Sequence, residues 1–207
     1  MKPWLLLLLF SLLQPASAAG PGVGVADDPA WRELFSHLAP TSPRQCAFEE
    51  RRYFPFRARP VVLTGTVRIA PGRGLSLEYA TPARRTVIID GEGILVRESG
   101  GQRAAPAQGR AQAATAALAA ILRFDPAELA RDFKLDGTLG PDAWKLTLIP
   151  REPGLAESLE SVSVDGVRGR LGRIELVRSA AQRIEIVLGP ATEGIAFSAD
   201  TLARAFR

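Results

Sequence analysis

Apolar and polar residues alternate along most of the chain with a period of two, a pattern typical of half-buried β-strands. Short stretches rich in glycine, proline and aspartate separate the alternating segments, as they do in hairpins. The segments that carry the pattern are 46–54, 61–69, 75–79, 86–89, 94–97, 144–148, 162–164, 174–176 and 184–188. We expect roughly eight to ten strands in one antiparallel sheet, strongly curved or partly closed, with helices against one face.

Three of the predicted turns lie between alternating segments, at Pro71–Gly74, Asp90–Gly93 and Asp165-Gly166. The last two segments, 174–176 and 184–188, are expected to be adjacent antiparallel strands. The polar, glycine-containing segment Ser99–Gly109 is predicted to be a loop.

A period of three to four residues replaces the alternation in three places, where we predict helices. The first begins at Asp28-Pro29, because aspartate caps free amides and proline at the first helical position loses no hydrogen bond. Its apolar stripe consists of Trp31, Leu34, Phe35 and Leu38. Ala111–Leu122 is helical by its alanine content, and Asp125-Pro126 begins a third helix with Leu129 and Phe133 inward.

The N-terminal residues have the pattern of a signal peptide. Lys2 precedes the apolar stretch Trp4–Leu13, and small residues follow at 16–18. This stretch is about half as long as a membrane-spanning helix, and no cysteine follows the cleavage site to accept a lipid. We predict cleavage after Ala18 and export of residues 19–207 to the periplasm as a single domain without a lipid anchor.

The composition argues against most catalytic chemistry. The chain has one histidine, His37, and one cysteine, Cys46, whereas a zinc site needs three or four ligands and a disulfide two cysteines. No Gly-x-Ser-x-Gly nucleophile motif occurs. The net charge is +4 and no basic run exceeds two residues, which argues against a nucleic-acid partner. We therefore expect a binding protein that has no metal, no cofactor and no enzymatic activity.

A series of motifs follows the first predicted helix in a characteristic order. In chain order they are Phe48-x-Glu50-x-Arg52, a hairpin from Gly65 to Pro82, the Asp90-Gly91 turn, a two-part helical insertion and the strand Trp144–Pro150. From Trp31 to Pro190 this order resembles the periplasmic outer-membrane lipoprotein carrier (LolA) family, and in particular its divergent LolA-like branch.

The resemblance implies an α+β fold that is mainly antiparallel β: an unclosed half-barrel whose short helices form a lid or plug over an apolar cavity. It implies a monomeric carrier that holds the acyl chains of a lipoprotein or lipid-like cargo. The donor would be an inner-membrane exporter and the recipient an outer-membrane acceptor. Lipoprotein carriers have an arginine before the proline of the hairpin that follows Gly65, whereas this chain has Ala70 before Pro71. A lipid-sensing envelope regulator of the same fold is the alternative.

An apolar cavity is also favoured by the number of apolar faces, because both the sheet and the helices offer one. Burying one methylene is worth about 0.8 kcal/mol, so a sixteen-carbon chain gains on the order of 10 kcal/mol before costs. The alternative is that the same residues fill an ordinary core. The residues expected to line the cavity are Leu75, Leu77, Tyr79, Val87, Ile89, Leu118, Ile121, Leu122, Leu129, Phe133, Trp144, Leu146 and Leu148.

Overall fold

The computed structural model describes residues 24–104 and 110–207, so the predicted signal peptide and its cleavage site lie outside the described residues. The helices are α1 (Pro29–Leu38), α2 (Arg110–Arg123), α3 (Pro126–Asp132), α4 (Pro153–Ala156) and α5 (Ala199–Ala205). The strands are β1 (Arg44–Tyr53), β2 (Val61–Ala70), β3 (Gly74–Thr81), β4 (Arg85–Asp90), β5 (Gly93–Glu98), β6 (Gly101–Ala104), β7 (Phe133–Leu139), β8 (Ala143–Pro150), β9 (Ser161–Val167), β10 (Arg170–Ser179), β11 (Gln182–Leu188) and β12 (Thr192–Glu193).

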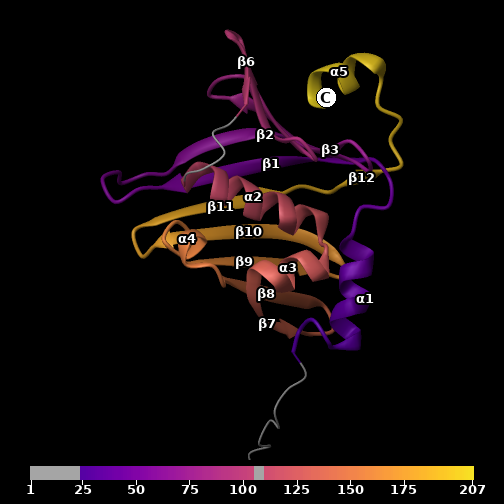
Figure 1. Ribbon diagram of the computed structural model, residues 1–207, viewed down its shortest axis with the longest axis vertical. Helices are drawn as coiled ribbons and strands as arrows, with labels where there is room; N and C mark the ends of the chain where they lie inside the picture. The colour runs from indigo at the N-terminus through magenta and orange to yellow at the C-terminus, as the bar shows by residue number, and fades with distance from the viewer. Residues whose placement is uncertain (1–23, 105–109) are drawn as a thin grey trace, which may run out of the picture.

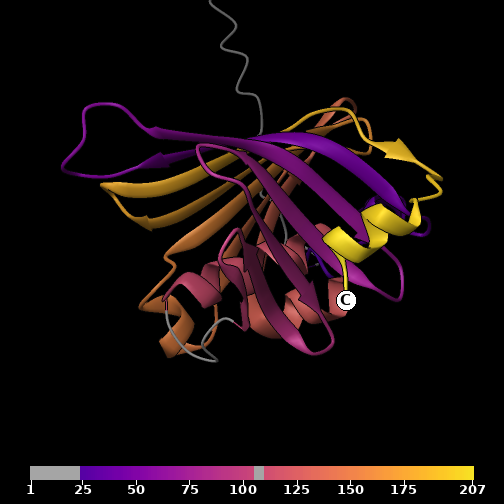
Figure 2. The same cartoon turned by 90° about the horizontal axis from the view of Figure 1, so that it is seen from above.

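The twelve strands of the described residues all belong to one curved sheet (Figure 1). Its order is β6-β5-β4-β3-β2-β1-β11-β10-β9-β8-β7, every neighbouring pair is antiparallel, and β12 pairs with the start of β1. In the described part of the chain β6 and β7 are the two edges, so the sheet forms an open half-barrel. Figure 2 shows α2 and α3 inside the curve of this half-barrel. The predicted fold class is therefore confirmed.

Two glycines let aromatic rings lie flat against the inner face of the sheet. A Cβ atom at Gly65 would be 2.7 Å from the ring of Phe48 on the neighbouring strand. A Cβ atom at Gly166 would be 2.6 Å from the indole of Trp144 and 2.0 Å from the carbonyl of Arg170. Because only glycine leaves room for these contacts, Gly65 and Gly166 permit the close packing of the two rings against the sheet.

The main core lies on the concave face, between the sheet and the helices. The apolar stripe predicted for α1 is fully buried there. Four aromatic rings from three segments meet edge to face or tilted: Trp31, Phe35, Phe124 and Trp144, with successive centroids 5.7–6.5 Å apart. Such pairs contribute about 0.5–1.5 kcal/mol each beyond the area that they bury.

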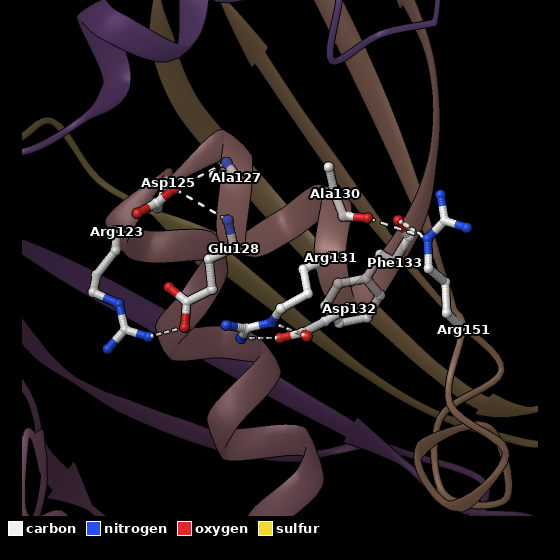
Figure 3. A network of polar contacts seen from close by, with 9 residues as sticks. All are labelled: Arg123, Asp125, Ala127, Glu128, Ala130, Arg131, Asp132, Phe133 and Arg151. Carbon is white, nitrogen blue, oxygen red and sulfur yellow. Dashed lines mark hydrogen bonds and ion pairs between the residues drawn. The ribbon is translucent and has the colours of Figure 1, made fainter.

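Polar contacts fasten α3 to the end of β8 (Figure 3). The side chain of Asp125 caps the helix by accepting hydrogen bonds from the amides of Ala127 and Glu128, at 2.9 and 3.1 Å. At the other end, Nε of Arg151 donates to the carbonyls of Ala130 and Phe133, at 3.1 and 2.9 Å. Side chains therefore satisfy some of the free backbone groups at each end of α3.

The C-terminal helix packs on the opposite, convex face. Phe206 and Ala205 are buried with Ala70 in a second, smaller apolar cluster. Arg97 donates to three carbonyls at the end of α5, those of Ala203, Arg204 and Phe206, at 2.7–3.1 Å. In Figure 1 this helix lies beside β3, well away from α2 and α3.

Several predictions about individual elements were wrong. The sheet has twelve strands and not eight to ten, because β6 lies in the predicted loop Ser99–Gly109 and β7 and β12 have little alternation. Phe133 begins β7 and is not in a helix. The predicted turn at Asp165-Gly166 lies within β9, and the chain reverses instead at Arg168 and Gly169, both with positive φ. α4 and α5 were not predicted.

Candidate functional site: an apolar pocket at the rim of the half-barrel

A pocket of about 630 Å³ opens at the end of the half-barrel where β1 begins and β2 ends. It lies between the last turn of α1, the β9–β10 hairpin, the segment that follows β11 and the junction of α2 and α3. Its lining residues are His37, Leu38, Arg44, Gln45, Cys46, Val67, Ile69, Leu122, Phe124, Val167, Gly169, Arg170, Leu171, Gly172, Leu188, Gly189, Pro190, Ala191 and Glu193. The volume falls within the roughly 300–1,000 Å³ that is usual for small-molecule sites.

The floor of the pocket is made where α2 ends. Leu122 comes from the last turn of α2, and Phe124 follows it in a left-handed conformation, with φ of 49°. This backbone conformation is unfavourable for a bulky residue. Two features stabilise this conformation. The amide of Phe124 donates to the carbonyls of Ala120 and Ile121, and the ring packs against Phe35 and Trp144.

The walls are apolar and the mouth is polar. Val67 and Ile69 come from β2, and Leu171 and Leu188 come from β10 and β11. An apolar wall with few polar groups binds hydrocarbon through burial of surface and without specific hydrogen bonds.

Arg44 is the central polar residue at the mouth. Its Nη2 atom donates to the carbonyl of Leu38 at the end of α1, at 2.6 Å, and its Nη1 atom lies 3.6 Å from a carboxylate oxygen of Glu193. Burial lowers the pKa of the Arg44 guanidinium, and the charge of Glu193 opposes that effect. The pair also borders a smaller, polar pocket of about 230 Å³ lined by residues 39–42.

His37 and Cys46, the single histidine and the single cysteine of the chain, both line the pocket. Burial raises the pKa of the Cys46 thiol, which keeps it in the weakly nucleophilic neutral form. His37 is exposed, with Nδ1 2.9 Å from the carbonyl of Glu33 in its own helix. Within the described ranges, no cluster of three or more histidine, cysteine, aspartate or glutamate side chains could hold a metal ion.

The thirteen residues predicted to line a cavity come together in the concave core. Twelve of them are buried there, and Val87 packs against them half-buried. Leu122 is the one member that also lines the rim pocket. The other pocket walls lie at strand ends, among them Val67, Ile69 and Leu171. Val67 and Ile69 alternate in the predicted strand 61–69, but the sequence does not indicate that their face ends at an opening.

One predicted cavity residue, Tyr79, belongs to a buried polar cluster. Its hydroxyl donates to Oε2 of Glu50 at 2.7 Å, and the other oxygen of that carboxylate pairs with Arg52. Arg85 lies over the Tyr79 ring, 4.3 Å from its centroid. Burial raises the pKa of Tyr79, and the negative charge of Glu50 raises it further.

A curved antiparallel sheet that encloses its own helices, with an apolar pocket at one rim, defines the class of open half-barrel proteins. Within that class, the profile of the family described as "Outer membrane lipoprotein carrier protein LolA-like" matches residues 25–205, and the chain belongs to this family. No curated protein sequence matches the chain. No helix in the described ranges is both long enough and apolar enough to cross a membrane.

Solved structures with a similar fold share little sequence with this chain. The LolA superfamily protein NE2245 from Nitrosomonas europaea is 9% identical, with a TM-score of 0.45 over 87% of this chain and 97% of its own. MucB is 19% identical, with a TM-score of 0.48 over 88% of this chain and 64% of its own. The matching chain of the Pseudomonas aeruginosa MucA/MucB complex is 18% identical, with a TM-score of 0.48 over 86% of this chain and 60% of its own. The chain thus spans less than two thirds of the MucB chains.

Proposed function

We propose that this protein is a periplasmic carrier that holds the acyl chains of a lipoprotein or lipid-like cargo in the rim pocket during transfer toward the outer membrane. The observation that carries the proposal is the pocket itself, about 630 Å³ in volume and walled by Val67, Ile69, Leu171 and Leu188. Membership of the LolA-like family supports it. At about 0.8 kcal/mol per buried methylene, a long acyl chain binds without any specific hydrogen bond.

We propose that the predicted cavity residues buried in the concave core reach cargo when α2 moves. Its last two turns hold on to the core with only three large side chains, Leu118, Ile121 and Leu122, all buried between small alanines. α3, by contrast, has its first turn capped by Asp125 and its C-terminal end bonded to Arg151 at the end of β8. Displacement of α2 about its junction with α3 would extend the rim pocket inward from Leu122 to the sheet residues that the sequence indicated, and these would then contact cargo.

The partners follow from the same proposal. The donor is an inner-membrane exporter, the recipient is an outer-membrane acceptor, and the carrier is a monomer exported after cleavage behind Ala18. The family arginine has no counterpart at its own position, because Ala70 stands there, buried against Phe206, and the nearby Arg68 pairs with Glu78. We therefore propose that cargo is held by apolar contact, and that an acylated cargo other than a lipoprotein serves equally well.

The test is displacement of a fluorescent fatty acid from the full chain and from a variant with a charge in the pocket wall. Leu171→Asp places a short, charged side chain in the apolar wall, and we expect the affinity to fall at least about tenfold. The matched control is Leu155→Asp, which alters a residue that is also half-buried against the core but lies outside the pocket. The control is expected to bind as the parent does.

Melting curves for both variants separate binding from stability. Unchanged fatty-acid affinity in a folded Leu171→Asp variant would contradict the proposal. An equal loss in both variants would also contradict it, because the effect would then not belong to the pocket. Mass spectrometry of the protein purified gently from its own periplasm would identify the bound cargo.

A further inference from the structure

The tip of the β1–β2 hairpin carries an exposed aromatic residue, Phe56, that stacks on the half-buried Phe54. Phe56 is 78% exposed, the largest exposure of any large apolar residue in the described chain. Its ring stacks on that of Phe54, with centroids 5.3 Å apart and planes inclined by 25°. Single exposed apolar residues are common on protein surfaces, but a stacked pair at a hairpin tip is a larger apolar surface that a partner can cover.

The tip is held in shape before it binds anything. The amide of Arg57 donates to the carbonyl of Phe54 at 3.1 Å, which closes a four-residue turn with Pro55 at its second position. Pro60 ends the loop immediately before β2. Two prolines in seven residues reduce the conformational freedom that the loop would lose on docking. Figure 2 shows this hairpin extending beyond the neighbouring strands.

The charge of the tip is entirely positive. Arg57 and Arg59 are exposed, and residues 54–60 contain no acidic side chain. Neither arginine forms an ion pair within the part of the chain that the structure describes. Arg84, in the next connection at this end of the sheet, is exposed as well. This combination of bare guanidinium groups and aromatic rings complements a surface with phosphate groups above hydrocarbon.

The other strand connections in the described chain lack this chemistry. Apart from the helical connection between β6 and β7, their residues include no aromatic side chain, for example Gly72-Arg73, Gly91-Glu92 and Ala180-Ala181. The aromatic tip is also far from the pocket mouth at Arg44, at the other end of β1. Since β1 has ten residues, the separation is about 30 Å at a rise of ~3.3 Å per residue.

We infer that the β1–β2 tip docks the protein on an anionic membrane surface. Phe54 and Phe56 enter the boundary between headgroups and acyl chains, and Arg57 and Arg59 contact lipid phosphates. This inference goes beyond carriage of cargo and does not depend on it, because the tip and the pocket share no residue. A docked molecule would hold its pocket mouth away from the membrane that it touches, at the opposite end of β1.

The experiment measures binding of the exported protein, purified from the periplasm, to vesicles. One set contains phosphatidylglycerol and phosphatidylethanolamine, and the other contains phosphatidylcholine alone. We expect binding to the anionic vesicles that weakens as salt is raised, and much weaker binding to the neutral ones. Arg57→Gln combined with Arg59→Gln should weaken binding roughly thirtyfold at low salt, and Phe56→Ser about tenfold.

Matched controls change the same residue types elsewhere. Arg32→Gln with Arg73→Gln removes two exposed arginines away from the tip, and Ile149→Ser removes a half-exposed apolar side chain that lies outside the pocket. Both controls should bind as the parent does, and all variants should melt at the parent temperature, because Phe56, Arg57 and Arg59 are exposed. Unchanged binding by either tip variant, or an equal loss in the controls, would overturn the inference. Failure of the parent to bind either vesicle would overturn it in favour of a protein partner.

Discussion

At the scale of single residues, Glu50 has the most unusual position, since it is a carboxylate buried inside the half-barrel. The strand pattern Phe48-x-Glu50-x-Arg52 places three alternate residues on the same face, and that face is the concave one. Burial of a charge is tolerated only when partners satisfy it. Here Arg52 supplies the opposite charge and Tyr79 supplies a hydrogen-bond donor from β3. The cluster thus ties two strands together on the inner face.

The contribution of this cluster can be measured with one conservative change. Tyr79→Phe keeps the ring but leaves Oε2 of Glu50 without its donor, so we expect the free energy of unfolding to fall by about 1–3 kcal/mol. Tyr53→Phe is the matched control, because its hydroxyl makes a longer bond of 3.2 Å to Glu185, and that carboxylate keeps its ion pair with Arg173 when the hydroxyl is removed. We expect this loss to cost under about 0.5 kcal/mol. Urea denaturation of both variants gives the comparison. Equal losses of unfolding free energy in the two variants would mean that the burial of Glu50 does not strengthen its hydrogen bond with Tyr79.

At the scale of elements, α2 and α3 are attached to the sheet in different ways. α3 is short, but Arg151 connects its C-terminal end to the end of β8 by directed polar bonds (Figure 3). The side chain of Asp125 caps its first turn. The last turns of α2 depend on the burial of a few large side chains, a weaker and less directional attachment. Phe124, in its left-handed conformation, lies between the two helices, directly after α2 and two residues before α3. This difference is the physical basis for proposing that α2, and not α3, opens the pocket.

The contribution of Arg151 to the stability of α3 can be tested against Arg131, an arginine of the same group of polar contacts (Figure 3). Arg151→Ala removes two charged hydrogen bonds to carbonyls at the end of α3, and should lower the free energy of unfolding by about 1–2 kcal/mol. Arg131→Ala removes an exposed pair with the adjacent Asp132, and should change it by under about 0.5 kcal/mol. Hydrogen exchange of the α3 amides should rise in the first variant alone. Equal exchange in both would show that Arg151 does not hold the helix.

At the scale of the whole molecule, the half-barrel has a core on each face. The large concave core joins the sheet to α1, α2 and α3, and the small convex core joins it to α5. Ile89 faces the concave core, so its neighbour Ile88 faces the convex side of β4. Ile88 is nevertheless completely buried, because α5 packs over β3 and β4 on that side. Arg207 adds ion pairs to Asp90 and Glu92 in the β4–β5 turn. The C-terminal helix is therefore an integral part of the fold.

The convex core yields a prediction for global stability. Phe206 is 1% exposed, so Phe206→Ala should lower the free energy of unfolding by about 3 kcal/mol or more and shift the melting temperature accordingly. Leu139→Ala, at a residue that is 40% exposed, serves as the control and should have a small effect. A melting temperature unchanged by Phe206→Ala would show that α5 detaches before the rest of the molecule unfolds.

The sequence by itself determined most of the local structure. The helix starts at Asp28 and Asp125 and the antiparallel alternation rest on interactions between residues that are near in the chain, so a pattern can indicate them. Turn chemistry was less reliable. Asp165-Gly166 has the composition of a turn, but its glycine serves the close approach of Trp144 from β8, which only the folded sheet brings there. The edge strand β6 was missed because it is exposed and has no alternation.

Only the tertiary structure decided how the apolar faces are used. Alternation indicated that Leu75, Leu77, Leu146 and Leu148 face inward, and all four do. It could not indicate that the helices cover them, or that the open volume lies at the rim near Leu171. Whether an apolar face is filled or empty depends on the volumes of side chains brought together from distant parts of the chain. Packing of that kind has no periodic signature in the sequence.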